Sequence, residues 1–245
     1  FDKEAAKFFL ERARNNVGLI IPGIAPIKDT IGGRWLWQNK KMFRELKEFM
    51  EEIHKTGAKL FVQITAGMGR SWAITDSLVE IHNSPVLRTL AKPIIDVQYQ
   101  SASPSVLPSR WSDKVTCREM TAAEIHEIID AFAKTAALCK EAGVDGVEVH
   151  AVHAVHEGYL LDQFTLKYTN HRTDQFGGSF ENRYRFATAI VKKIKAACGN
   201  NYPVSLRYSV VSKTKDFCVG AMPGEEYTEI GRDMEESEKA AKYLQ

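Results

Sequence analysis

The chain has 245 residues, of which 44% are hydrophobic and 26% are charged, and its formal net charge at pH 7 is +2. This composition is typical of a folded protein with one large domain or two small ones. The small net charge, spread over interspersed acidic and basic residues, argues against nucleic acid as a partner, and no apolar run reaches the roughly 20 residues that a membrane helix needs.

The cysteines are far apart and form no Cys-x-x-Cys pair, which argues against a zinc ribbon and against a disulfide framework. The first residues, FDKEAAK, do not have the form of a signal peptide. We therefore expect a cytoplasmic protein that has no membrane partner.

Helical periodicity alternates with short apolar runs along the chain. We predict helices over residues 2–16 and near 39–55, 121–142, 180–198 and 225–245, and strands over 17–23, 59–65, 145–150 and 203–209. Thr121 and Glu124 have the spacing of a capping box at the start of the third helix. Because strands that alternate with helices return to the same sheet through crossovers, the pattern indicates an α/β fold with a parallel sheet.

Two features do not fit a complete parallel barrel. The stretch from Ala66 to Met120 has no regular pattern and exceeds the roughly 12 to 15 residues at which structureless loops become uncommon, so we expect a small substructure or a lid there. Only about four strands are predicted, whereas a closed barrel needs eight. We infer that the chain is the central portion of a larger domain, or that something else covers the sheet edges.

Polar side chains lie at or just beyond the ends of three predicted strands. The carboxyl ends of parallel strands meet at one edge of a sheet, where active sites are found. The residues that we expect to converge there are Gln63 and Ala66 from the second strand and its end, His150, His153, His156 and Tyr159 from the third, and Arg207 from the fourth.

The three histidines allow a metal site or a proton-transfer site. On a helix His150 and His153 share a face while His156 points away, and on a strand residues three apart face opposite sides, so the spacing is poor for a metal. Proton transfer needs donors that hold a carbonyl oxygen and an acid within reach. Histidine and Tyr159 supply these groups, since a phenol stays protonated until charge develops on the substrate. At least one histidine is expected to be merely packed or exposed.

Gln63 and Arg207 are polar residues in otherwise apolar strands. An amide both donates and accepts, as the edge of a heterocycle requires, and a guanidinium near a strand end suits an anion or an electron-rich ring. The alternatives are an ordinary hydrogen-bonded core amide and a structural ion pair.

Three motifs carry a family resemblance. The run from His153 to Phe186, HAVHEGYLLDQFTLKYTNHRTDQFGGSFENRYRF, resembles the segment of Old Yellow Enzyme-like flavin oxidoreductases in which a His-x-x-(His/Asn) pair precedes Gly-Tyr-Leu. FVQITAGMGR and VSLRYS resemble the Gln-containing and Arg-containing strands of this family, in the same order. The chain is most similar to the branch of 2,4-dienoyl-CoA reductase and the bile-acid or steroid enone oxidoreductases.

The resemblance implies a TIM (β/α)8 barrel, of which residues 1–245 would form a partial FMN-binding domain with a substrate-side loop at about 66–120. Gln63, Arg207 and the region of Ala66 would bind FMN, and Ala66 stands near the position of a histidine found elsewhere in the family. A histidine pair would hold the substrate carbonyl oxygen, and Tyr159 would protonate the alpha carbon after hydride reaches the beta carbon.

The implied enzyme takes hydride from NAD(P)H through FMN to a C=C bond conjugated to a carbonyl or thioester, as in an enone, an enoyl- or dienoyl-CoA, or a steroid or bile acid. A homo-oligomer is compatible with it. The long members of the family carry a 4Fe-4S cluster and FAD beyond the barrel, and the family's phosphate-binding strands have no counterpart here. We expect residues 1–245 alone to bind FMN weakly for that reason.

One departure concerns the duplicated HAV unit in HAVHAVHEG, where the family has one His-x-x-His. The extra residues add about 10 Å of extended chain. Strand continuity selects His150 with His153, whereas proximity to Tyr159 selects His153 with His156; we favour the second pair. Two alternatives remain open: a metal-dependent TIM-barrel lyase or hydrolase using His150, His153 and His156, and a non-catalytic remnant.

Overall fold

The computed structural model describes residues 2–153 and 158–245. The strands of its main sheet are β1 (Leu19–Ile20), β2 (Ala25–Pro26), β3 (Lys59–Thr65), β6 (Gly146–Ala151) and β7 (Val204–Tyr208). The longer helices are α1 (Lys3–Arg14), α2 (Lys40–Lys55), α6 (Ala122–Glu141), α8 (Phe180–Cys198) and α9 (Met234–Tyr243).

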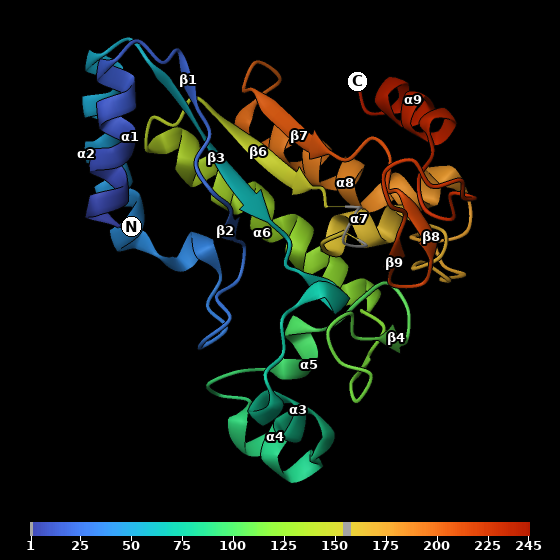
Figure 1. The fold of residues 1–245 in the computed structure, drawn as a ribbon. Coiled ribbons are helices and arrows are strands. Elements are labelled where there is room, and N and C mark those ends of the chain that lie inside the picture. Colours follow the sequence, from blue (N-terminus) through green and yellow to red (C-terminus); the bar gives the residue numbers. More distant parts are fainter. Residues whose placement is uncertain (1, 154–157) are drawn as a thin grey trace.

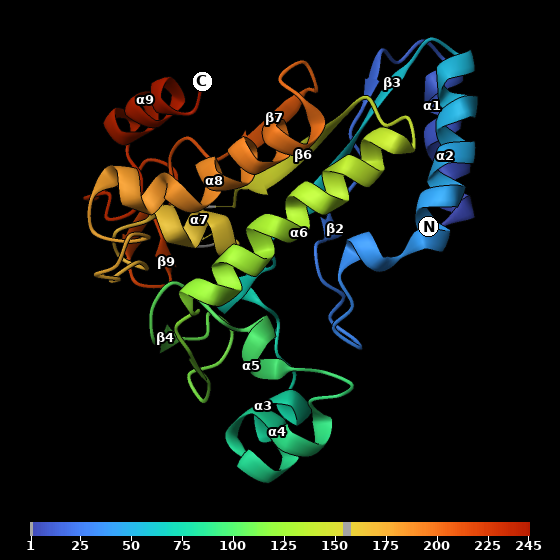
Figure 2. The same ribbon diagram turned by 180° about the vertical axis from the view of Figure 1, so that it is seen from behind.

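The main sheet has the order β1-β3-β6-β7, with β2 also paired to β3, and all of these pairs are parallel. Figure 1 shows the strands with α6 and α8 behind them, and Figure 2 shows the same two helices from the other side. The predicted α/β arrangement is confirmed. The sheet is curled like part of a barrel. One face packs against α6 and α8, and the other face, called the inner face below, is turned away from these helices.

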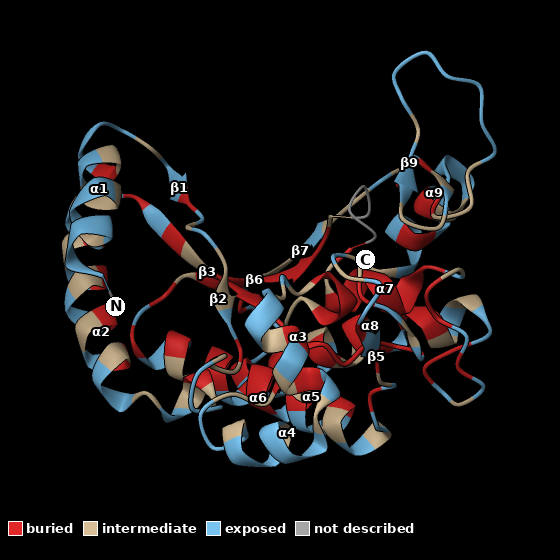
Figure 3. Cartoon of the chain, turned by 60° about the horizontal axis from the view of Figure 1, so that its bottom comes forward, coloured by how far each residue is buried: buried red, intermediate tan, exposed pale blue. Residues whose placement is uncertain are grey.

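Strand alternation decides which side chains form the core. In β6, Val147 and Val149 are only 0% and 1% exposed and pack with the helix layer. Glu148 and His150 alternate with them and therefore project from the inner face. Figure 3 shows buried residues gathered along the sheet, α6, α7 and α8, while α4 and most of α1 are exposed.

The helix starts follow the predicted capping pattern. The Thr121 hydroxyl accepts from the Glu124 backbone N–H at 3.2 Å, and the Glu124 carboxylate accepts from the Thr121 N–H at 2.9 Å. Ser179 caps α8 by accepting from the Asn182 N–H. These bonds satisfy backbone donors that have no partner within a helix.

The predicted strand over 17–23 is wrong in detail. Two short segments replace it, and between the pairs Ile20–Leu60 and Ala25–Ile64 this side has one residue more than β3. Pro22 lies in the interruption and has no N–H to donate to a sheet. An extra residue of this kind forms a bulge that re-aims the chain.

The predicted helix over 225–245 begins too early, because α9 starts at Met234 after its cap Asp233. A small hairpin, β8 (Thr214–Asp216) with β9 (Val219–Gly220), and a loop come before it. The Glu229 carboxylate stabilises this loop by accepting from the Ser212 hydroxyl at 2.6 Å and from the Gly231 N–H at 2.8 Å.

The stretch over 66–120 contains a substructure, as expected. Its elements are η2 (Gly69–Ser71), α3 (Asp76–Asn83), α4 (Pro85–Ala91), α5 (Val97–Gln100) and the antiparallel pair β4 (Leu107–Pro108) and β5 (Thr116–Cys117). Figure 1 shows α3 and α4 projecting away from the sheet. Within the described ranges, no helix is both long and apolar enough to cross a membrane.

Candidate active site

The strand register places the polar inner-face residues in two transverse rows. Gln63 is paired with Glu148, and Glu148 with Ser205. In the next row toward the carboxyl ends, His150 is paired with Arg207. The structure therefore brings the predicted residues of three separate strands onto one face.

Gln63 is 2% exposed and only half satisfied. Its Nε2 donates to the Glu148 carboxylate at 2.8 Å, whereas its Oε1 is buried without a hydrogen-bond partner in the described part of the chain. An ordinary core amide has partners for both ends. The orphaned oxygen favours a role in binding a donor that the described residues do not supply.

Arg207 is exposed on the inner face and makes no ion pair with any residue of 2–153 or 158–245. The predicted alternative of a structural ion pair is therefore not seen among those residues. The guanidinium of Arg207 and the orphaned oxygen of Gln63 thus present a donor and an acceptor group on the same face of the sheet.

The rings of His150, His153 and Tyr159 form a cluster. Ring centroids are 5.0 Å apart for the two histidines, 5.1 Å for His150 and Tyr159, and 4.8 Å for His153 and Tyr159. His150 is 1% exposed, and its Nδ1 has no hydrogen-bond partner in the described chain. Two of the three histidines predicted as candidate oxygen holders are thus neighbours of the predicted acid.

Burial lowers the pKa of His150 to about 4, and the nearby His153 and Arg207 act in the same direction. His150 is therefore neutral near pH 7 and carries one ring N–H for donation. A neutral imidazole can donate a hydrogen bond to a carbonyl oxygen and polarise it without transferring its own proton to that oxygen.

Backbone hydrogen bonds join the residues that precede 154–157 to the residues that follow them. The His153 carbonyl accepts from the Gly158 N–H at 2.8 Å, and the Val152 carbonyl accepts from the Tyr159 N–H at 3.2 Å. His153 has φ +80°, an uncommon conformation for a residue with a side chain, and its N–H donates to the Ser209 hydroxyl at 3.0 Å. These bonds keep Tyr159 beside the end of β6 despite the duplicated HAV.

His156 lies outside the described residues, so its predicted pairing with His153 is not tested. The reason for preferring that pair was proximity to Tyr159, and His150 also lies close to Tyr159. Proximity to Tyr159 is therefore also met by the pair that strand continuity selects, His150 with His153. His150 with His153 is the pair that the structure places together.

Tyr159 immediately precedes a short helix, α7 (Leu160–Thr165). Gln163 is fully buried and its Nε2 donates to the carbonyls of Gly158 at 2.8 Å and Met68 at 2.9 Å. Its Oε1 accepts from the Arg70 N–H at 3.2 Å. Gln163 thereby joins the loop after β3 to the turn that carries Tyr159.

Asp162 forms a buried ion pair with Arg232 at 2.5 Å, and both residues are almost inaccessible to solvent. Arg232 also donates to the Ser209 carbonyl at 2.5 Å. The pair therefore ties α7 to the end of β7 and to the segment before α9.

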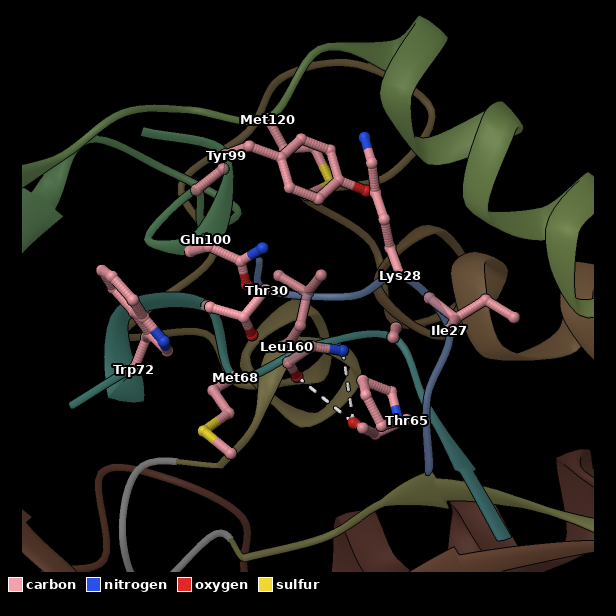
Figure 4. Close-up of a pocket in the computed structure, with 15 residues that line it drawn as sticks. Ile27, Lys28, Thr30, Thr65, Met68, Trp72, Tyr99, Gln100, Met120 and Leu160 are labelled. Atoms are coloured by element: carbon pink, nitrogen blue, oxygen red, sulfur yellow. Dashed lines mark hydrogen bonds between the residues drawn. The ribbon is translucent and has the colours of Figure 1, made fainter. Parts of the chain in front are cut away.

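Ala66 follows β3 and is 5% exposed. It lines a small cavity of about 70 Å³ between the strand ends and the lid formed by 66–120, with Thr65, Met68, Tyr99 and Leu160 among its other lining residues. Figure 4 shows these side chains and the Thr65 hydroxyl bonded to the backbone of Gly67. A space of this size holds a few waters or one small group.

The polar residues after α7 bond to backbone. Asn170 donates to the carbonyls of Phe164 and Phe176, and Arg172 donates to those of Pro104 and Met120. Arg172 therefore ties the 66–120 stretch to the segment that follows α7.

Sequence reasoning did not single out Glu148, Ser205, Gln163 or Asp162. A charged residue within the apolar run DGVEVH was a usable signal for Glu148. Gln163 and Asp162 gave no such signal, because polar residues in a short amphipathic segment are usually solvent-exposed.

Within the described ranges, no group of three or more His, Cys, Asp or Glu is arranged to hold a metal ion. The metal-dependent alternative is not favoured. His156, one of its three proposed ligands, lies outside those ranges.

The family model described as the NADH:flavin oxidoreductase / NADH oxidase family matches residues 2–242. The chain belongs to this family. Cinnamate reductase from Clostridium sporogenes is 42% identical over an alignment of 251 residues, which covers 100% of this chain and 34% of that protein. NADH oxidase from Thermoanaerobacter brockii is 33% identical over 243 residues, which covers 97% and 31%.

Solved structures of flavin oxidoreductases agree. The complex of 2-naphthoyl-CoA reductase matches with a TM-score of 0.72 and 28% identity over 98% of this chain and 33% of that one. Old Yellow Enzyme from Pichia sp. matches with a TM-score of 0.64 and 27% identity, over 84% and 50%. The fold is therefore part of an Old Yellow Enzyme-like TIM barrel, and the chain spans about a third of the length of the curated relatives named above.

Proposed function

We propose that the protein is a flavin-dependent ene reductase that uses NAD(P)H and FMN to reduce a C=C bond conjugated to a carbonyl, carboxylate or thioester. The observation that carries the proposal is the gathering of Gln63, Arg207, His150, His153 and Tyr159 at the inner face and carboxyl edge of one parallel sheet. Family membership gives the reaction class, and these residues give the means to perform it.

The residues present fit FMN. The orphaned Oε1 of Gln63 accepts a hydrogen bond and the exposed Arg207 donates several, so together they match the alternating N–H and C=O groups of a flavin's pyrimidine edge. When bound, FMN supplies the capacity to accept and donate hydride. Arg207 would also stabilise negative charge on the reduced ring.

The substrate carbonyl would lie between His150 and His153. Two N–H donors there stabilise the negative charge that develops on oxygen as the C=C bond is reduced. We propose this pair over His153 with His156 because both rings contact Tyr159 in the structure. Tyr159 would then give its phenolic proton to the alpha carbon.

The names of the relatives guide the choice of substrates. One is called a cinnamate reductase, and one structure is a complex of a reductase with 2-naphthoyl-CoA. We propose unsaturated acids or thioesters with an aromatic group as the first compounds to assay. Residues 66–120 would form the substrate side of the site, since Tyr99 and Met68 line the cavity beside Leu160.

The absorbance spectrum of the purified protein tests the proposal. A flavin band that bleaches anaerobically with NADH or NADPH supports it. Protein whose addition causes no change in the flavin spectrum even at a large excess of FMN would contradict it. We also expect residues 1–245 alone to bind FMN weakly, since no phosphate-binding site is identified in their described part, and an FMN titration of that fragment checks this point.

A further inference from the structure

Glu148 is hydrogen-bonded to the amide of Gln63 on the inner face of the sheet. Its Oε1 accepts from Gln63 Nε2 at 2.8 Å, and its Oε2 accepts from the Ser205 hydroxyl at 3.0 Å. The three residues are register neighbours on β3, β6 and β7, so the bonds run straight across the sheet on its inner face. Glu148 is 8% exposed.

This carboxylate has no cationic partner. In the described part of the chain no Lys, Arg or His forms an ion pair with Glu148, and its two bonds come from neutral groups. Burying a carboxylate in this way costs free energy. A neutral side chain would fill the position at less cost, so packing alone does not explain an acid there.

The orienting effect follows from hydrogen-bond chemistry. An ionised carboxylate only accepts, so Gln63 must turn its NH2 group toward Glu148. The amide oxygen is then directed away from Glu148, and this Oε1 atom is buried and without a partner in the described chain. The orphaned oxygen is therefore a consequence of Glu148.

We propose that Glu148 is a positioning residue of the flavin site, which sets Gln63 so that its Oε1 accepts from the N3–H of the isoalloxazine. The inference rests on the proposed function. N3–H is the single ring N–H of oxidised flavin, and it lies between two carbonyl groups. Arg207 would donate to a carbonyl oxygen of the flavin ring, and Gln63 would accept from N3–H. The order of donor and acceptor groups in the protein thus matches the pyrimidine edge of the ring.

The proposal also predicts an electrostatic effect. A fixed negative charge near the ring disfavours the electron-rich reduced flavin and opposes Arg207. Glu148 therefore helps to keep the flavin a strong reductant. A residue that only supported the fold would affect neither the reduction potential nor the choice between flavin analogues.

The test compares FMN with 3-methyl-FMN, which lacks the N3 proton, in the purified protein and its Glu148→Gln variant. We expect the parent protein to bind FMN about tenfold or more tightly than the methylated analogue, as for loss of a buried hydrogen bond. In Glu148→Gln the Gln63 amide can turn either way, so this preference falls to about threefold or less. The flavin midpoint potential becomes more positive.

Glu141→Gln, at the exposed end of α6, is the matched control and should change neither quantity. Ser205→Ala removes one of the two donors to Glu148 and keeps its charge. It should leave the FMN preference close to that of the parent, because the carboxylate still fixes the Gln63 amide. If Glu148→Gln does not fold, Gln63→Leu carries the test: the preference for FMN over 3-methyl-FMN should disappear, and an unchanged preference would overturn the proposal.

The outcomes separate the two proposals. If FMN binds but the analogue preference and the midpoint potential of Glu148→Gln equal those of the parent, the positioning role is overturned while the flavin site stands. Protein that binds no flavin would instead overturn the proposed function.

Discussion

The imidazole of His150 and the phenol of Tyr159 lie with their ring centroids 5.1 Å apart, although one belongs to the end of β6 and the other precedes α7. The bonds from Gly158 to His153 and from Tyr159 to Val152 bring the two elements together. A ring N–H donor and a phenol therefore lie close together, as the proposed reduction of a conjugated C=C bond requires.

His150 should make the stability of the protein depend on pH. Its folded-state pKa of about 4 lies below the ordinary value of about 6.5, so the folded protein binds fewer protons than the unfolded chain between these values. The stability that this provides is fully present above about pH 6.5 and is lost as the pH falls toward 4.

A His150→Asn variant, which keeps a donor but does not titrate, checks this dependence. Between pH 7.5 and pH 4.5 the parent protein should lose about 2 to 3 kcal/mol more free energy of unfolding than the variant, measured by denaturant titration. Equal losses in the two proteins would show that His150 is not held neutral by burial.

Gly158 should not tolerate a side chain. It has φ +76°, and a Cβ there would lie 2.5 Å from the Asp162 Cβ. We expect Gly158→Ala to lower the free energy of unfolding by about 2 kcal/mol or more, from backbone strain and overlap together. Gly57→Ala is the control, because Gly57 has φ +83° and open space around its Cβ, so only about 1 kcal/mol of strain applies. Equal effects in denaturant unfolding would argue against the overlap.

The buried pair of Asp162 and Arg232 should be important for stability. Arg232→Met leaves the Asp162 carboxylate buried without its cation, which costs about 3 to 5 kcal/mol. Lys193→Met, which removes one partner of the exposed pair with Asp130, should cost less than about 1 kcal/mol. Chemical denaturation measures both. Similar unfolding midpoints for the two variants would mean that the buried pair contributes little.

The long periodic elements were predictable from sequence. The strand over 59–65 and the helix over 180–198 match β3 and α8 residue for residue, because apolar spacing, Ser179 and Gly199 all agree locally. The first strand and the last helix were less predictable. Pro22 interrupts the first strand. The residues around Glu229 have a helical pattern, but the Glu229 carboxylate accepts hydrogen bonds that hold a loop instead.

The candidate site was predictable only in part. Residues near the carboxyl ends of parallel strands lie along one edge of the sheet, so Gln63, His150 and Arg207 could be grouped in advance. The orientation of the Gln63 amide and the support from Gln163 depend on contacts between residues far apart in the chain, to Glu148 and to Gly69 and its neighbours. Such contacts leave no local pattern.

The most direct test of the account is a single-turnover experiment on Tyr159→Phe. The FMN-loaded protein is reduced anaerobically with NAD(P)H and then mixed with an unsaturated acid or thioester, while the flavin absorbance is followed. We expect flavin reduction by NAD(P)H to be unchanged and reoxidation by the C=C substrate to be slower by about 10² to 10⁴-fold, the usual contribution of a general acid. Reoxidation at the parent rate would contradict the assignment of Tyr159 as the proton donor beside His150 and His153.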